Sequence, residues 1–335
     1  MIPRTFLGVF LPFVGLFLLG GCRDSSEPGG GASPRYAFIT NGVAEFWTIA
    51  EAGAKQAGKD LGVEVGVFMP GSLTDQKQML EDAAARGYAG VAVSPIDPAN
   101  QTGMLDQVAA ATKLVTHDSD APDSARLAYI GMDNYTAGRL CGQLVKEALP
   151  QGGEVMILVG RMEQDNSRKR RQGVIDELLG RSEDASRFDP PSGVIEGEGF
   201  KILGTLTDAF DFAKAKANAE DALSRHPEID AMIGLFAYNP PAILQALEQA
   251  GKLNVVKVIG FDEDEATLAG IQAGTVHGTV VQNPYEYGYQ SVKVLHGLAS
   301  GGEAPTDPFI HIPGRQIRKD NVEAFWADLR AKVGK

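Results

Sequence analysis

The sequence predicts an α/β fold made of two doubly wound, parallel-sheet lobes. Short apolar runs alternate with longer amphipathic segments from residue 35 onward, and about ten such runs are present. Apolar strands that alternate with helices are typical of a parallel sheet covered on both faces. Ten strands exceed one comfortable doubly wound domain, and a length of 335 residues suggests two domains of ~100–200 residues each. The 40 glycines fit the many tight turns that such a fold needs.

Short apolar runs mark the expected strands. They lie at residues 36–40, 63–69, 91–94, 114–116, 127–130, 155–159, 202–206, 231–235, 255–260 and 279–281. The segments between them repeat apolar residues three and four positions apart, as Phe46, Ile49, Ala50, Gly53 and Ala54 do. Comparable patterns predict helices at 73–86, 100–112, 135–148, 168–179, 211–224, 240–250, 264–273, 285–299 and 321–333. We expect the last of these helices to pack on one lobe.

The first 22 residues read as an export signal. Arg4 is the only charged residue before an apolar run from Phe6 to Leu19, which is short for a membrane span of ~20 residues. The run ends in Leu19-Gly20-Gly21-Cys22, which resembles the bacterial lipobox. That resemblance implies removal of residues 1–21, lipidation of Cys22, and a place on the periplasmic or cell-surface face of a bacterial membrane. An ordinary signal peptide with a chance cysteine is the alternative.

Residues 22–34 are expected to be the lipid anchor and a flexible tether. The stretch is rich in Gly, Ser and Pro and contains no large apolar side chain. The chain has two cysteines, so lipidation of Cys22 leaves Cys141 alone. Cys141 lies within a helical pattern and is expected to be a buried small apolar residue without a disulfide partner.

Polar and aromatic residues follow nearly every expected strand. Ligands bind outside the carboxyl ends of the strands in open α/β sheets. The residues at these ends are Thr40, Asn41, Phe46, Trp47, Ser94, Asp97, Asp118, Ser119, Asp120, Asp208, Phe210, Asp211, Phe236, Tyr238, Asn239, Asp262 and Gln282. A role as helix caps alone is the alternative for several of them, since Asp, Asn, Ser and Thr favour that role. Taken together, hydrogen-bonding groups beside flat rings favour a neutral polyol, whose hydroxyls both donate and accept.

The run Arg168-Lys169-Arg170-Arg171 falls in the first turn of an expected helix, capped by Asn166 or Ser167. Cations are unfavourable at a helix N-terminus. We expect Lys169 and Arg171 to be solvated. Arg170 shares a helix face with the apolar Val174, so it is expected to reach the cleft and donate two hydrogen bonds to adjacent hydroxyls.

Composition and motifs argue against several other classes. A formal charge of −12 argues against a nucleic-acid partner. The sequence has no G-x-S-x-G elbow, no phosphate-binding G-x-x-x-x-G-K-[ST] loop and no metal-ligand spacing among its five histidines, so no cofactor and no metal are expected. A secreted glycosidase that uses a pair from Asp97, Asp118 and Asp262 stays an alternative.

The body resembles the bacterial periplasmic sugar-binding proteins of the ribose/galactose type, which are solute receptors for ATP-driven importers. The resemblance covers nearly all of residues 35–318. It rests on an ordered set of landmarks: Phe46-Trp47, Ser94-Pro95-x-Asp97, Asp118, Asp133-Asn134, Arg168-x-Arg170, Phe210-Asp211, His226-Pro227, Asn239, Gly260-Phe261-Asp262 and Gln282. It implies a type I periplasmic binding protein fold, in which three crossings join the two lobes, and a binding role rather than an enzymatic one.

The resemblance also implies how a monosaccharide is held. Phe46 and Trp47 would lie on one side of the ring and Phe210 on the other. Asp118 and Asp262 would accept hydrogen bonds from hydroxyls. The residues Arg170, Asn239 and Gln282 would donate and accept, with Thr40, Asn41, Ser94 and Ser119 completing the site.

Four positions depart from the ribose-type pattern. Ala44 and Ser94 stand where that pattern has asparagines, Trp47 replaces a phenylalanine, and Ser119 replaces an arginine. These changes leave more room near Trp47, and Asp120 is a further candidate for contact with the ligand there. The ligand is therefore expected to be a pentose or a hexose, as a pyranose or a furanose, and not necessarily ribose.

By the same resemblance, lobe one comprises residues 35–132 and 283–311, and lobe two comprises 133–282 and 312–335. The expected protein is a monomer that passes its sugar to the membrane subunits of an importer. A sugar sensor that serves signalling alone is the alternative. A sugar-responsive transcription regulator would need a DNA-binding headpiece where this chain has its signal and tether.

Overall fold

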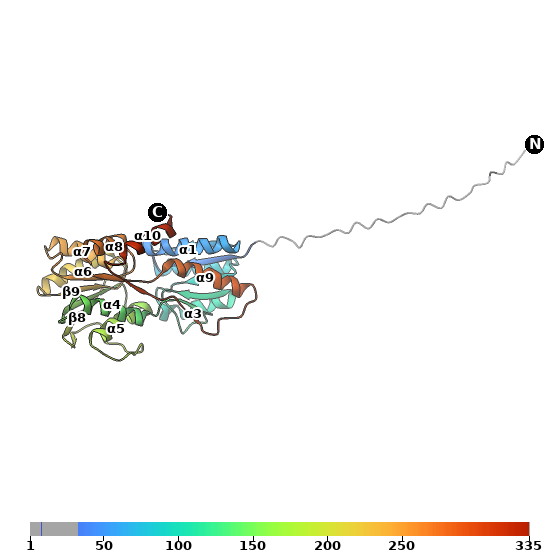
Figure 1. Cartoon of the computed structure of the whole chain (residues 1–335). Helices are drawn as coiled ribbons and strands as arrows, with labels where there is room; N and C mark the ends of the chain where they lie inside the picture. Colours follow the sequence, from blue (N-terminus) through green and yellow to red (C-terminus); the bar gives the residue numbers. More distant parts are fainter. Residues whose placement is uncertain (1–7, 9–32, 335) are drawn as a thin grey trace, which may run out of the picture. The chain divides into compact units, whose positions relative to one another are not determined.

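A computed structural model describes residue 8 and residues 33–334, which include a compact unit that begins at Ser33 (Figure 1). The predicted signal peptide, Cys22 and nearly all of the predicted tether lie outside the described residues. Within the described part of the chain, no helix is both long and apolar enough to cross a membrane.

The first sheet has six strands in the order β12-β5-β4-β3-β1-β2, all of them parallel. Its strands are β1 (Arg35–Ile39), β2 (Glu64–Phe68), β3 (Gly90–Val93), β4 (Lys113–His117), β5 (Tyr129–Gly131) and β12 (Phe309–His311). The helices that cover it are α1 (Glu45–Leu61), α2 (Leu73–Ala85), α3 (Pro98–Ala111) and α9 (Pro284–Ala299). We call this sheet with its helices the first lobe.

The second sheet has seven strands in the order β13-β11-β10-β9-β6-β8-β7, and its two edge strands run antiparallel. Its strands are β6 (Gly153–Val159), β7 (Ile195–Gly197), β8 (Phe200–Thr207), β9 (Ala231–Gly234), β10 (Lys257–Phe261), β11 (Gly278–Val281) and β13 (Arg315–Ile317). Its helices are α4 (Asn134–Ala148), α5 (Asp165–Leu178), α6 (Phe212–Arg225), α7 (Asn239–Gln249) and α8 (Glu265–Ala273). We call this sheet with its helices the second lobe.

The chain passes between the sheets three times. It leaves the first lobe between β5 and α4, returns between β11 and α9, and crosses again between β12 and β13. The predicted fold class, two doubly wound lobes joined by a three-strand hinge, is therefore confirmed. The limits of lobe one at 35–132 with 283–311, and of lobe two at 133–282 with 312–335, stay a proposal.

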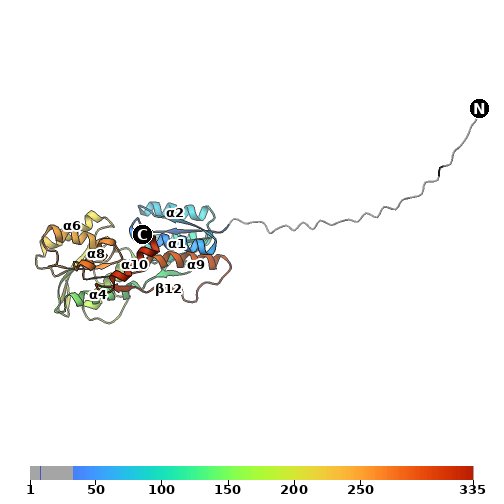
Figure 2. The ribbon, with the colours of Figure 1, turned by 45° about the horizontal axis from the view of Figure 1, so that its top comes forward.

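The C-terminal helix α10 (Val322–Val333) contacts both lobes. Phe325, Trp326 and Leu329 pack against the core of the second lobe, and the helix also contacts α1 of the first. Figure 2 shows α10 lying between α8 and α1. The helix therefore contacts both lobes rather than packing on one lobe alone.

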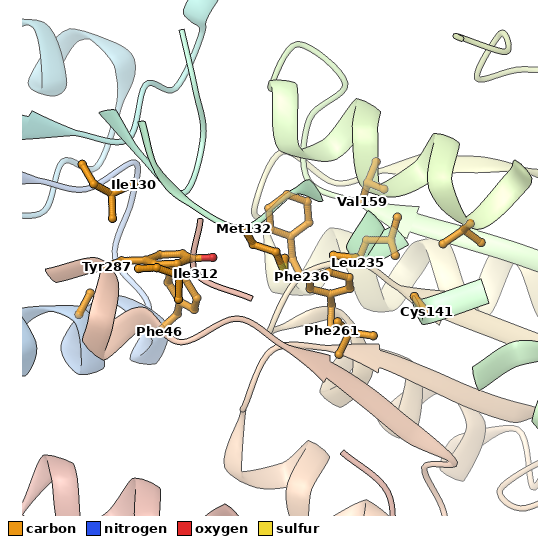
Figure 3. Packing of buried hydrophobic residues seen from close by; sticks show 14 of the residues in the cluster. Phe46, Ile130, Met132, Cys141, Val159, Leu235, Phe236, Phe261, Tyr287 and Ile312 are labelled. Atoms are coloured by element: carbon orange, nitrogen blue, oxygen red, sulfur yellow. The ribbon is translucent and has the colours of Figure 1, made fainter. Parts of the chain in front are cut away.

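The largest apolar cluster runs from one lobe into the other. Figure 3 shows Ile130 and Tyr287 on the first-lobe side, Val159 and Phe261 on the second-lobe side, and Met132 of the first crossing between them. Cys141 belongs to this cluster, is fully buried and is free among the described residues, as expected for a small core residue.

Glycines bring two helices into close contact in each lobe. A Cβ atom at Gly288 of α9 would overlap the carbonyl oxygen of Ala50, and one at Gly53 of α1 would overlap that of Tyr285. The pair α4 and α5 repeats this arrangement, with Gly138 and Gly173 facing backbone carbonyls of the other helix. Since α1 and α5 both begin at the cleft, these contacts set where their first turns lie.

We expect Gly288→Ala to lower the midpoint of thermal unfolding, because the added methyl group must push α1 and α9 apart. Overpacking of this kind costs about 1–3 kcal/mol. Gly297→Ala on the same helix is the matched control, since nothing lies within 4 Å of its Cβ position. At that position alanine removes the conformational-entropy cost of a glycine within a helix, about 0.5–1 kcal/mol, and should raise the midpoint. Equal midpoints for both variants would contradict the close contact.

Candidate functional site

A cavity of about 500 Å³ lies where the carboxyl ends of strands from both sheets meet. Eight of the predicted site residues line it: Asn41, Phe46, Trp47, Asp118, Arg170, Phe210, Asp262 and Gln282. They come from the ends of β1, β4, β8, β10 and β11 and from the first turns of α1 and α5. The structure therefore brings these residues together across the two lobes.

The other four predicted residues do not line this cavity. Ser94 lies behind Asp118 and donates a hydrogen bond to its Oδ2 at 3.0 Å. Thr40 Oγ1 donates to the carbonyl of Gly42 at 2.7 Å, which holds the loop after β1. Asn239 accepts from the Phe236 amide, and Ser119 is buried, with no partner for its Oγ among the described residues. Direct contact of these four with a ligand stays a prediction.

The guanidinium group of Arg170 is fully buried at the base of the cavity. Its Nε donates to Asn134 Oδ1 at 2.8 Å, Nη1 to the carbonyl of Leu235 at 3.2 Å, and Nη2 to Asp118 Oδ1 at 3.4 Å. It lies 4.3 Å from the centre of the Phe261 ring. These bonds use three of its five N–H groups, which leaves two for a ligand.

Two buried carboxyl groups, Asp118 and Asp262, interact electrostatically with this guanidinium. Both follow a strand in a left-handed conformation, with φ of 59° and 68°, which aspartate tolerates better than most residues. Burial raises the pKa of Asp118, while Arg170 and hydrogen bonds from Ser94 and Asn166 oppose the rise. Burial raises the pKa of Asp262 to about 6, again opposed by Arg170 and by Gln282, whose Nε2 donates to Asp262 Oδ1 at 2.7 Å.

Aromatic rings enter the cavity from both lobes. Phe46 and Trp47 lie edge to face at the start of α1, with ring centres 4.7 Å apart. Phe210 follows β8 in the second lobe and lies edge to face with Phe236 at 5.4 Å. The ring pair on one lobe and Phe210 on the other thus line the same space. Such faces can stack on the C–H faces of a sugar ring.

Asp208 holds the aromatic loop of the second lobe in place. Its carboxylate accepts hydrogen bonds from the Phe210 amide at 2.9 Å, from Asn239 Nδ2 at 2.9 Å and from the hydroxyl of Tyr238. Burial raises the pKa of Asp208 to about 6. Asn239 is thereby committed to this loop rather than to the cavity.

Two predictions about the basic run were wrong. Arg171 is not solvated: it is 1% exposed and donates to Thr205 and to the carbonyls of Asp189 and Pro190. The helix is capped by neither Asn166 nor Ser167, because α5 begins at Asp165 and Gln164 takes the N-cap position. Lys169 is partly exposed and pairs with Asp165 at 2.9 Å. The residue expected to face the cleft, Arg170, does so.

Sequence reasoning did not single out Glu263. This residue is 4% exposed, lines the cavity, and has an Oε2 atom without a hydrogen-bond partner among the described residues. Burial and the neighbouring Asp262 raise its pKa well above the usual range. Its position just after β10, one residue beyond Asp262, was the available signal. No group of side chains in residues 33–334 has the arrangement of a metal site.

Residues 36–303 match the periplasmic binding protein domain family. The chain belongs to that family. The D-allose-binding periplasmic protein of Escherichia coli is 26% identical over 288 residues, which are 81% of this chain and 86% of that protein. The matched domain and these relatives are binding proteins rather than enzymes, so the glycosidase alternative is set aside.

Solved structures of the same class superpose well on this fold. GanP, a glucose-galactose binding protein from Geobacillus stearothermophilus, has a TM-score of 0.78 and 26% identity, over 87% of this chain and 99% of that one. An ABC transporter solute-binding protein from Burkholderia graminis, solved with D-arabinose, has the same TM-score and identity, over 87% of this chain and 96% of that one.

We expect Arg170→Met to lower the free energy of unfolding by about 3–5 kcal/mol at pH 7.5, because it leaves buried carboxylates without their cation. The loss should shrink toward pH 5. A carboxyl whose pKa is raised in the folded state binds more protons folded than unfolded, so stability falls as pH rises from about 4 through the raised value. Removing the guanidinium raises the pKa of Asp118 and Asp262 further and steepens that fall.

The measurement is chemical unfolding followed by circular dichroism at several pH values. Arg168→Met on the same helix is the matched control, since the Arg168 side chain is 48% exposed and should change stability by less than about 0.5 kcal/mol. A loss that is the same at both pH values would show that packing, rather than charge, explains the effect of Arg170.

Proposed function

We propose that the protein is a lipid-anchored receptor that captures one monosaccharide, a pentose or a hexose, between its lobes. In this proposal it delivers the sugar to an ATP-driven importer. The observation that carries the proposal is the cavity itself, which is lined by buried Arg170, by the carboxyl groups of Asp118 and Asp262, and by aromatic rings from both lobes. Relatives whose names refer to allose, ribose, arabinose, glucose and galactose support a sugar ligand.

The proposed binding mode assigns each group a role. Asp118 and Asp262 accept from sugar hydroxyls, while Arg170 and Gln282 donate to them. Phe46 and Trp47 cover one face of the ring, and Phe210 covers the other. A hydroxyl left unmatched in the closed cavity costs ~1–3 kcal/mol, so such a site distinguishes epimers.

Delivery to an importer is inferred from the family and from the arrangement of the lobes. The ligand would contact both lobes at once, so it favours the closed arrangement. Membrane subunits of an importer would then recognise the closed pair of lobes. A receptor that only signals would use the same closure, and a requirement for the protein in sugar uptake separates the two roles.

We expect at least one pentose or hexose to raise the melting temperature and to change tryptophan fluorescence in a panel of monosaccharides. Trp47 lines the cavity and should respond, while Trp326 on α10 provides a background signal. Asp262→Asn should weaken binding of the responding sugar roughly 5- to 150-fold, since it removes one charged acceptor worth ~1–3 kcal/mol.

The matched control for this variant is Asp211→Asn. Asp211 caps α6 outside the cavity, and asparagine is an equally good cap. Its affinity should equal that of the unchanged protein. If Asp262→Asn binds the sugar as tightly as Asp211→Asn does, the assignment of the site is wrong. If no monosaccharide produces a response, the proposed function is wrong.

We expect Cys22→Ser to move the protein from the membrane fraction to the soluble fraction of bacterial cells that express the full chain. The serine cannot form the thioether that holds the lipid, and the fold should be unchanged because it begins beyond the tether. Membrane association that persists in this variant would contradict anchoring at Cys22. Cys141→Ser provides the control for loss of a thiol elsewhere.

A further inference from the structure

A second cavity adjoins the first at the same edge of the sheets. It has a volume of about 440 Å³ and, like the first, is lined by both lobes. The two cavities share Leu73, Ile96, Arg161 and Ala209 in their walls. These four residues follow strands or begin a helix at the carboxyl edge, so the second cavity continues the proposed sugar site outward. We call it the outer cavity.

The outer cavity has the chemistry of a sugar site without the deep burial of the first. Arg161 offers a forked donor, and its guanidinium carbon lies 5.4 Å from the centre of the Phe210 ring, which also lines the first cavity. Carboxylates from both lobes, Asp97 and Glu163, are available as acceptors. Asp97 is already fixed in place as the N-cap of α3, where it accepts from Asn100 Nδ2 at 2.8 Å.

Exposed apolar side chains gather around the mouth of this cleft. Six large apolar residues are exposed among those that the structure describes, and three of them line the first cavity: Val43, Leu73 and Phe212. They come from both lobes, and Leu73 lines the outer cavity too. Apolar surface left exposed next to a binding cleft is more typical of an interaction site than of a solvated loop.

A monosaccharide held at the base of the first cavity does not use the polar groups of the outer cavity. The donors and acceptors assigned to it, Asp118, Arg170, Asp262 and Gln282, all line the first cavity and none lines the outer one. A ring held there would leave Arg161, Asp97 and Glu163 to water. The first cavity alone falls within the range of about 300–1,000 Å³ that suits drug-sized ligands.

We propose that the outer cavity is a second sugar subsite, so that the protein also binds a disaccharide, whose inner ring takes the position of the monosaccharide. This inference rests on the proposed function. The second ring packs against Leu73 and Arg161, and its hydroxyls donate to Glu163 and Asp97. The glycosidic bond passes the shared wall at Ile96 and Ala209.

The test is calorimetry of the full-length mature protein with disaccharides and with their component monosaccharides. Maltose, cellobiose, lactose, trehalose and xylobiose cover several linkages and both hexose and pentose units. At least one disaccharide should bind about tenfold more tightly than either of its components. Arg161→Ala and Glu163→Gln should reduce that gain. Because Glu163 lines only the outer cavity, Glu163→Gln should keep the affinity for the monosaccharide within about twofold.

Arg168→Ala is the control, because Arg168 is an exposed arginine of α5 that lines neither cavity. Binding of monosaccharides without any gain from a second ring would overturn the outer subsite and leave the proposed function intact. No binding of any sugar would overturn both. Variants that impair sugar uptake in cells but leave disaccharide affinity unchanged would overturn the subsite by assigning this surface to the importer.

Discussion

Burial of one guanidinium group organises the site. Arg170 is fully buried, and a charge in that position is tolerated only if it is paired and hydrogen-bonded. Its partners come from separate places in the chain: Asp118 after β4, Asn134 at the first crossing, and the carbonyl of Leu235 after β9. Satisfying this one group therefore fixes the end of a first-lobe strand, a hinge segment and a second-lobe strand relative to one another. That network in turn fixes the positions of the groups that face the ligand.

Close contacts between helices explain how the hydrogen-bond network around Arg170 is held in place. Gly138 on α4 and Gly173 on α5 let two backbones approach to the point where any Cβ would overlap a carbonyl, and one of those carbonyls belongs to Arg170 itself. A rigid helix pair thus carries the guanidinium. The pair α1 and α9 repeats the arrangement through Gly53 and Gly288 and carries the aromatic pair at the start of α1. Both walls of the cavity rest on contacts that larger side chains would prevent.

Much of the site could be predicted from the sequence, because local patterns in the sequence mark where strands end. Eight of twelve predicted site residues line the cavity, since parallel strands bring their carboxyl ends to one edge. That rule does not say which of these side chains bond within their own loops instead of facing the cavity. Thr40 and Asn239 were therefore predicted to line it. The burial of Arg171 depends on residues 189–190 folding back over α5, a long-range contact without a local signal. The three-residue strands β7, β12 and β13 were missed because they have no apolar run and pair only at sheet edges.

The carboxyl groups around the cavity can serve a neutral ligand as hydrogen-bond partners. Three buried carboxyl groups, Asp118, Asp262 and Glu263, line the cavity with Arg170. Burial raises the pKa of Glu263 well above its usual range, which favours its protonated form, and it raises the pKa of Asp262 to about 6, which leaves that carboxyl mostly ionised at neutral pH. Arg170 offsets part of the negative charge that the two aspartates bring to the base of the cavity. A protonated Glu263 has a hydroxyl to donate as well as an oxygen to accept, and sugar hydroxyls are suited to such a mixed set of partners.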